Sequence, residues 1–199
     1  MVQAIHRNAS RLQRLTNDRL DVTRIESITL KLSKEKFNLV DLISDVMEHF
    51  KNDIQKKGDN TKLLLLSSEP NDDDDALIIE ADKVRIAQVI SNLLNNAIKF
   101  IQDGTISIHT MKIVDGNKNN SRNQKQEVIV SIKGTGTDID SEILPRLFTK
   151  FAAKSESGTG LGLFISKSII EAHGGRIWAK NNRDGRGPTF VFSMPIANK

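Results

Sequence analysis

The sequence predicts an α+β fold in which helices cover one face of a β-sheet. Three observations lead to this prediction: several segments place apolar residues at helical spacing, several others have the pattern of strands, and Gly-rich or polar stretches separate them. Runs of strands together with helices that can cover one face indicate a two-layer sandwich. At 199 residues the chain is long enough for one sizeable core plus an appendage.

The first predicted element is a long helix over residues 3–26, a stretch without Gly or Pro. Ile5, Leu12, Leu15 and Val22 lie close to a heptad seam, which predicts packing against another helix. Since no partner precedes it, we expect this helix to be half of a helical hairpin whose other half is absent from this chain.

The next elements alternate between strand and helix. Residues 34–39 predict a short strand, and Asn38 is placed to cap a helix over 39–57. Leu63–Leu66 and Ala76–Ile79 have the pattern of buried strands.

The remaining elements follow from the same signals. We predict a helix over 82–101, a hairpin of strands 105–114 and 127–133 with a mobile polar connection at 115–126, a short helix over 140–147, a helix over 161–173, and strands over 175–180 and 188–195.

Composition excludes several classes of protein. There are no cysteines, no run of eighteen apolar residues and no signal-peptide pattern, so we expect no disulfide, no thiol chemistry and no membrane span, and a cytoplasmic setting. The net charge is +4, but residues 1–36 carry 8 basic and 4 acidic side chains while the remainder carries 21 of each. We therefore expect no nucleic-acid binding and no contact with a membrane.

The acidic run Asp72–Asp75 has two interpretations, a metal site or a solvated loop. The loop is favoured, because adjacent carboxylates in a flexible segment lack the fixed spacing that coordination requires.

Asn92, Asn96 and Lys99 share one face of the predicted helix over 82–101. Asparagine is a mediocre helix former, so a cluster of it inside an apolar helix has a local cost that something must offset. The face is either the wet side of an amphipathic helix or a site for a Mg²⁺-bound polyphosphate, which carboxamide oxygens and an ammonium suit. The residues alone leave the two equally open.

Gly158, Gly160 and Gly162 alternate just before an apolar helical run. Such a segment lets backbone amides close on a phosphate, although alone it is a weak signal. Combined with the asparagine cluster it suggests an ATP pocket.

The order of the motifs resembles the ATP-binding catalytic domain of sensor histidine kinases. The resemblance covers nearly the whole chain and is carried by residues 20–27, 82–85, 92–100, 147–151, 158–163 and 169–175. It implies the Bergerat-type sandwich with a mixed sheet, shared with type II topoisomerases, chaperones and mismatch-repair ATPases. It also implies a division into the second helix of a dimerisation hairpin, residues 1–30, and a catalytic domain, residues 31–199.

The resemblance further implies roles for individual residues, with ATP and Mg²⁺ as cofactors. Asn96 would ligate Mg²⁺, Asn92 would hold phosphate or metal-bound water, and Lys99 would contact phosphate. Phe100 would lie near the base or ribose, and Lys154, in a very short lid over 152–157, would reach the γ-phosphate. Asn92, Lys99 and Lys154 are thus the expected catalytic residues. The other expected nucleotide contacts are Gly134, Gly136, Asp138 and Ile139, and the backbone of Gly158, Thr159, Gly160, Leu161, Gly162 and Leu163.

The chain departs from the family in its first glycine box, Asp-x-Gly-x-Gly, whose Asp accepts from the adenine amino group. Here the segment runs from Gly134 through Gly136 to Asp138, so only the middle glycine agrees. Loss of the carboxylate costs roughly 1.5–3 kcal/mol of binding if nothing replaces it. Asp138 also stands where Gly would allow unusual backbone dihedrals. Impaired ATP binding is the favoured account. A sequence variant that is tolerated is the second account, and a pocket in which Asp138 takes over base recognition is the least favoured.

The family's phosphoacceptor motif is also absent, and His6 does not match it. We therefore expect the chain to transfer phosphate to a histidine of a partner domain, within a two-component system that includes a response regulator. Asn92 stands where the ATPase relatives usually have Glu, which disfavours an ATPase of the topoisomerase or chaperone type. The rival of another class is a non-catalytic module that binds a partner kinase or response regulator. A monomer or weak homodimer is expected.

Overall fold

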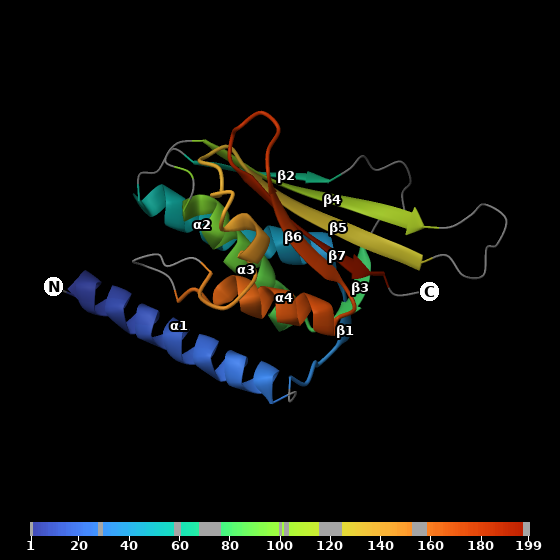
Figure 1. The fold of residues 1–199 in the computed structure, drawn as a ribbon, viewed down its shortest axis with the longest axis horizontal. Coiled ribbons are helices and arrows are strands. Elements are labelled where there is room, and N and C mark those ends of the chain that lie inside the picture. Colours follow the sequence, from blue (N-terminus) through green and yellow to red (C-terminus); the bar gives the residue numbers. More distant parts are fainter. Residues whose placement is uncertain are drawn as a thin grey trace.

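The computed structural model describes residues 2–27, 30–57, 61–67, 77–99, 101, 104–115, 125–152 and 159–196. Four α-helices and seven strands follow one another in the part of the chain that it describes (Figure 1). They are α1 (Val2–Glu26), β1 (Glu35–Asn38), α2 (Leu39–Lys57), β2 (Lys62–Ser67), β3 (Ile78–Ala81), α3 (Lys83–Lys99), β4 (Thr105–Asp115), β5 (Lys125–Gly134), α4 (Gly162–Ala172), β6 (Arg176–Asn181) and β7 (Pro188–Pro195), with a 3-10 turn η1 (Leu144–Arg146) before α4.

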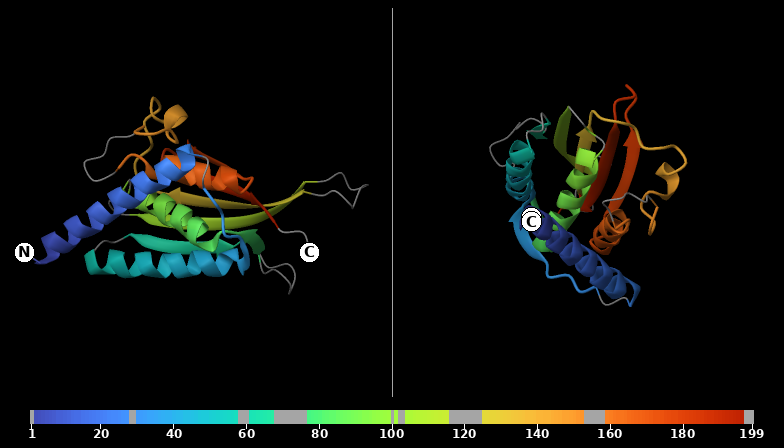
Figure 2. Two further views of the ribbon diagram at one scale, coloured as in Figure 1. Left: turned by 90° about the horizontal axis from the view of Figure 1, so that it is seen from below. Right: turned by 90° about the vertical axis from the view of Figure 1, so that its left-hand side faces the viewer.

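The main sheet has five strands in the order β2-β4-β5-β7-β6. β2 and β4 pair in parallel and the other neighbours pair antiparallel, so the sheet is mixed. The helices α2, α3 and α4 lie together on one side of it (Figure 2) and contact β2, β5, β6 and β7. This arrangement confirms the two-layer α+β sandwich.

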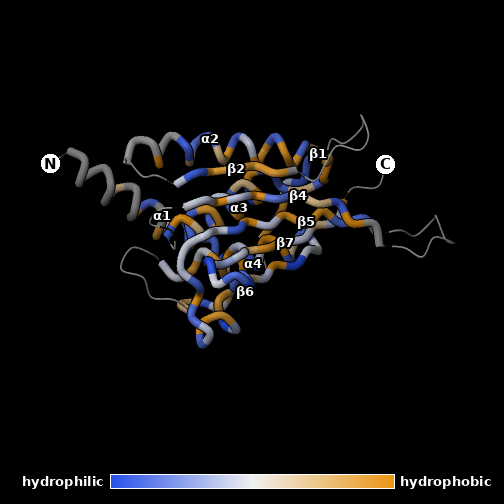
Figure 3. The backbone as a smooth tube through the Cα atoms, turned by 90° about the horizontal axis from the view of Figure 1, so that it is seen from above, coloured by the Kyte–Doolittle hydropathy of each residue, from blue (hydrophilic) through white to orange (hydrophobic). Residues whose placement is uncertain are grey.

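The core lies between the sheet and these helices. Val128, Val130 and Ile132 alternate along β5 and are fully buried, as strand pleating requires. Hydrophobic residues recur among hydrophilic ones along the strands and along α3 (Figure 3). Other fully buried side chains of the core are Ile43, Ile79, Ile86, Ile90, Leu93, Leu94, Ile106, Ile108, Phe190 and Phe192.

The prediction of buried strands was wrong for β2. Leu64 and Leu66 are 45% and 43% exposed, because β2 is an edge strand and helices cover one face of the sheet. The next strand begins at Ile78 and pairs with β1 in a separate two-stranded sheet, with Glu35 opposite Ala81. This pairing joins segments more than forty residues apart, which local patterns do not specify.

The predicted short helix over 140–147 is reduced to the 3-10 turn Leu144–Arg146. Pro145 lies in its first turn and has no N–H to continue a helical ladder. The run Asp72–Asp75 and residues 116–124 of the 115–126 connection lie outside the described residues.

The first helix, α1, packs along α4 at the edge of the helical layer (Figures 1 and 2). Val22 and Ile25 are partly buried against the core, whereas Leu12 is 64% exposed. The C-terminal half of the predicted seam therefore contacts the core of the sandwich. No described helix, α1 included, is both long and apolar enough to span a bilayer.

Candidate functional site

The helix α3 is anchored at its start by Asp82, a buried residue. Its Oδ1 accepts from the backbone N–H of Arg85 at 3.1 Å, and its Oδ2 accepts from the N–H of Ser33 at 3.0 Å. The apolar side of the helix then packs into the core with six buried residues. This packing turns Asn92 toward the start of α4, and both Asn92 and Asn96 are half-buried.

Asn92 meets α4 in direct contact. Its Nδ2 donates to Ser166 Oγ at 2.9 Å, and Ser166 is 2% exposed. A Cβ on Gly162 would lie 2.3 Å from Asn92 Oδ1, which is impossible without displacing Asn92. The absence of a side chain at Gly162 therefore lets the asparagine face of α3 lie against the first turn of α4, seventy residues away in sequence.

Asn96 continues this face by one helical turn. Its Nδ2 donates to the backbone oxygen of Asn92 at 2.7 Å, and lies 3.4 Å from Asn92 Oδ1. The amide nitrogen is thus taken by the helix, and the atom left to face a ligand is the carboxamide oxygen. Such an oxygen fits Mg²⁺, which binds through one or two protein oxygens together with phosphates and waters. Lys99 is exposed one turn further on, and Phe100 lies outside the described residues.

The described residues contain no group of three or more His, Cys, Asp or Glu side chains that could hold a metal ion. A metal brought in by a polyphosphate, with Asn96 as its protein ligand, does not need such a group.

The segment before α4 presents backbone N–H groups at a helix N-terminus. Gly160 has φ +69°, a conformation that favours glycine, and its carbonyl accepts from the N–H of Phe151 at 2.9 Å. Leu161 is buried, and its carbonyl accepts the helical bond from Ile165 at 2.9 Å. A helix N-terminus suits an anion, because its backbone N–H groups and the helix dipole both favour negative charge there. Thr159 and Leu163 are half-buried, while Gly158 and Lys154 lie outside the described residues.

His173 joins the N-terminal end of α3 to the C-terminal end of α4. Its Nε2 accepts from the backbone N–H of Asp82 at 3.0 Å, so Nδ1 carries the proton and donates to the carbonyl of Ile169 at 2.8 Å. Burial lowers the pKa of His173 below its usual value, although the Ile169 carbonyl acts in the opposite direction. The imidazole is therefore kept neutral and serves as a structural link.

The loop of residues 134–139 follows β5 and is held by the turn between β6 and β7. Asn181 Oδ1 accepts from the N–H of Ile139 at 2.9 Å, and Asn181 Nδ2 donates to the Ile139 carbonyl at 2.7 Å. Asn182 Nδ2 donates to the carbonyl of Gly134 at 3.0 Å. A Cβ on Gly187 would lie 2.6 Å from the backbone nitrogen of Gly136, so the two segments touch through backbone.

Within this loop, Asp138 does not force the backbone into a strained conformation. Phe151 is the one non-glycine residue with positive φ among those described, so the expected conflict between Asp138 and a glycine conformation was wrong. The Asp138 side chain nevertheless has a buried oxygen, Oδ1, without a hydrogen-bond partner. A buried acceptor left in this state costs about 1–3 kcal/mol.

Gly134 is buried beside Ile101, which follows α3. A Cβ at Gly134 would lie 3.1 Å from Ile101 Cδ1, so part of the room for a larger side chain is filled by an apolar one. The 134–139 loop thus lies at the C-terminal end of the helix that carries Asn92 and Asn96.

Several residues of the site have partners that sequence reasoning missed. Arg85 and Gln88 of α3 both bind Asp21 of α1, each at 2.8 Å. Ser166 and Asn181 gave no signal in the sequence, since a single Ser or Asn in an element is uninformative without its partner.

The family described as histidine kinase-, DNA gyrase B- and HSP90-like ATPase matches residues 81–198. The chain is 29% identical over 191 residues to the sensor histidine kinase WalK of Bacillus subtilis, covering 93% of this chain and 28% of that protein. It therefore spans less than a third of this relative's length.

Solved structures agree with the family match. Full-length ShkA in complex with AMPPNP superposes with a TM-score of 0.79 at 26% identity, covering 100% of this chain and 38% of that one. The histidine kinase ThkA, solved in complex with the response regulator protein TrrA, has a TM-score of 0.64 at 30% identity and covers 98% of this chain and 50% of that one.

Proposed function

The chain belongs to the family of histidine kinase-, DNA gyrase B- and HSP90-like ATPases, as the ATPase domain type of two-component sensor kinases, and from this premise we propose that it binds Mg-ATP and donates its γ-phosphoryl group to a histidine outside this chain. The observation that carries the proposal is the contact of Asn92 with Gly162 and Ser166. It brings a carboxamide face and a helix N-terminus together, which is the combination that a metal-bound triphosphate needs.

In this proposal different residues bind different parts of Mg-ATP. Asn96 holds Mg²⁺ through its carboxamide oxygen, and the ion offsets negative charge on the phosphates. Asn92 fixes phosphate or a metal-bound water, Lys99 contacts phosphate, and the backbone from Thr159 to Leu163 faces the triphosphate. Lys154 and Phe100 keep the roles that the resemblance implies, at the γ-phosphate and near the base or ribose. Transfer in line to a histidine then depends mainly on positioning and charge neutralisation.

We further propose that nucleotide binding is impaired. Gly134 has no carboxylate for an adenine amino group, and the Ile101 side chain lies against it. The carboxylate of Asp138 stands four positions later with a buried, unpartnered oxygen. The base side therefore lacks its expected acceptor, while the phosphate side keeps the residues of the family.

The same hypothesis predicts the domain division and the protein partners. We propose that residues 1–30 form one helix of a dimerisation hairpin, that residues 31–199 form the catalytic domain, and that the phosphate passes to a response regulator through a partner's histidine. ThkA, a relative solved with the response regulator TrrA, supports this class of partner. Asn92 supports transfer over hydrolysis, because a carboxamide is not a general base for water.

The test is calorimetric titration of AMPPNP with Mg²⁺. The chain is compared with a Gly134→Asp, Asp138→Gly double variant, and with Thr137→Ala as a control at an exposed position of the same loop. We expect the double variant to bind more than tenfold tighter, corresponding to about 1.5–3 kcal/mol, and the control to match the unchanged chain.

Each other result has a distinct meaning. Equal micromolar binding by the chain and the double variant would contradict the impairment and leave the kinase function standing. Absence of binding by both would contradict nucleotide use and favour the non-catalytic module that binds a kinase or a response regulator. Steady ATP hydrolysis without a histidine substrate would favour the ATPase alternative.

A further inference from the structure

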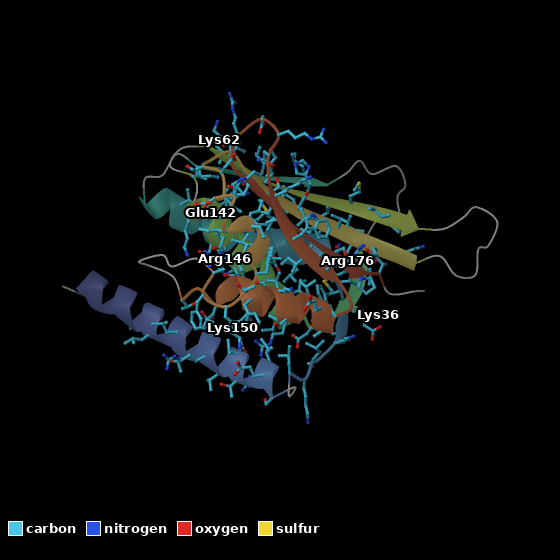
Figure 4. All side chains as sticks on the ribbon, in the orientation of Figure 1. Lys36, Lys62, Glu142, Arg146, Lys150 and Arg176 are labelled. Atoms are coloured by element: carbon cyan, nitrogen blue, oxygen red, sulfur yellow. The ribbon has the colours of Figure 1, made fainter. Side chains whose placement is uncertain are left out.

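The helix α1 is held to the catalytic body by buried carboxylates. Asp21 is 6% exposed, and its two oxygens accept from Arg85 Nη1 and Gln88 Nε2 of α3, each at 2.8 Å. Lys150, labelled beside α1 in Figure 4, pairs with Glu26 at the end of the same helix. These polar contacts add to the packing of Val22 and Ile25, so α1 has a defined position, its seat, against the rest of the fold.

A second carboxylate of α1 reaches the segment that precedes α4. Asp18 is 9% exposed, and its Oδ2 accepts from the hydroxyl of Thr159 at 2.7 Å. The same hydroxyl oxygen accepts from the backbone N–H of Leu161 at 3.2 Å. Three groups therefore form one chain of donors, from the Leu161 amide through the Thr159 hydroxyl to the Asp18 carboxylate.

This chain of hydrogen bonds occupies donors that an anion would use. Leu161 immediately precedes the first residue of α4, where a phosphate would be bound. While Asp18 accepts from Thr159, the Leu161 N–H is directed to the hydroxyl. A triphosphate at this place also brings negative charge toward a carboxylate that is screened little by water. Asp18 and the triphosphate thus compete for the same donors and repel each other.

We propose that Asp18 is a positioning residue of the nucleotide site, acting through Thr159 so that the seating of α1 and the binding of a triphosphate oppose each other. This inference rests on the proposed function. Linkage is reciprocal. If bound nucleotide weakens the packing of α1 against the rest of the fold, then packed α1 lowers the affinity for nucleotide by the same factor. The helix then reports on the state of the nucleotide site to whatever segment it is joined to.

The first experiment measures binding of Mg-AMPPNP by calorimetry in the Gly134→Asp, Asp138→Gly background, where the base side no longer limits affinity. Asp18→Asn removes the charge with little change of shape, and Asn17→Ala is the matched control at an exposed position of the same helix. We expect Asp18→Asn to tighten binding by about fivefold or more, within the usual range of coupling between sites, and the control to leave it unchanged.

The role of Thr159 is tested by a double-mutant cycle. In a Thr159→Val background, Asp18→Asn should have a much smaller effect on affinity, because the hydroxyl that joins the two sites is gone and only the charge repulsion remains. Thr159→Ser keeps the hydroxyl and should restore the response to Asp18→Asn. An effect of Asp18→Asn that is equal in both backgrounds would overturn the part assigned to Thr159.

The seat of α1 is measured by amide hydrogen exchange over residues 15–26. Mg-AMPPNP should speed exchange there when Asp18 is present, and much less after Asp18→Asn. Nucleotide binding that Asp18→Asn leaves unchanged or weakens would overturn the coupling while the proposed function stands. Absence of any Mg-AMPPNP binding in the double-variant background would overturn the proposed function, and the coupling with it.

Discussion

Two regions of the site are built in different ways. The region that we propose to hold the phosphates, the phosphate-side region, consists of Asn92, Asn96, Ser166 and residues 159–163. It depends on side chains that touch one another across α3 and α4. The loop that we propose to face the base, the base-side loop of residues 134–139, is held through its backbone by Asn181 and Asn182.

This difference explains why the sequence departs from the family pattern in the base-side loop and not in the phosphate-side region. A substitution in the phosphate-side region displaces its neighbours, because the two helices fit together without spare room. A side chain in the base-side loop can change while the loop keeps its path, since the groups that hold it are carbonyls and N–H groups. Gly134 and Asp138 therefore alter the chemistry of the loop and leave its fold in place.

The largest effect is expected from Gly162→Ala. Alanine in a helix usually stabilises by about 0.5–1 kcal/mol relative to Gly. Here its Cβ would lie 2.3 Å from Asn92 Oδ1, so we expect a loss of about 1–3 kcal/mol in the free energy of unfolding. Affinity for Mg-AMPPNP should fall by more than about tenfold, because displacing Asn92 removes a hydrogen bond to a charged group, worth about 1.5–3 kcal/mol. Chemical denaturation and calorimetry measure the two quantities.

An Asn92→Ala background provides the control for this prediction. With the asparagine truncated there is room for the new Cβ, and Gly162→Ala should no longer destabilise the protein. A loss of stability that persists in this background would mean that the clash lies elsewhere.

The next effect is expected from Asn181→Ala in the support of the base-side loop. This change leaves the N–H and the carbonyl of Ile139 without their hydrogen bonds, which should cost about 1–2 kcal/mol of unfolding free energy. Lys180→Ala, at the exposed neighbouring position, should cost less than about 0.5 kcal/mol. Urea denaturation measures both, and equal effects of the two variants would show that the loop does not depend on Asn181.

A smaller effect of opposite sign is expected from Asp138→Ala. Removing a buried oxygen without a partner should raise the free energy of unfolding by about 1 kcal/mol, or the melting temperature by about 2–4 °C. Thr137→Ala, at an exposed position, is the control. A lower melting temperature after Asp138→Ala would mean that the carboxylate is already satisfied in solution.

The last prediction concerns pH and the link between α3 and α4. The folded-state pKa of His173 is lowered by burial, so the unfolded chain binds the proton more readily. Its contribution to stability is then complete above about pH 6.5 and is lost as pH falls below that value. Unfolding measured between pH 8 and 5 should show this fall, and His173→Asn should remove it.

A matched variant separates this effect from the acid response of the protein as a whole. His49→Gln changes an exposed histidine and should leave the pH dependence as it is. A stability that is flat or rises below pH 6.5 would contradict the neutral role of His173.

The sequence predicted the elements that carry strong local patterns. The helix predicted over 82–101 is observed as Lys83–Lys99 and the strand predicted over 127–133 as Lys125–Gly134, since apolar periodicity is a property of neighbouring residues. It also predicted the family and the sandwich, which the comparisons confirm. The site residues stay a prediction, because no ligand contact tests them.

Tertiary structure alone decided which distant residues meet. The pairing of β1 with β3, the exposure of Leu64, the hold of Asn181 on Ile139, and the contact of Asp18 with Thr159 have no local signature. Each depends on where two segments far apart in sequence come to lie after the core has packed. The conformational preferences of neighbouring residues indicate where helices and strands form. A polar contact between two elements also depends on the relative positions that packing gives them.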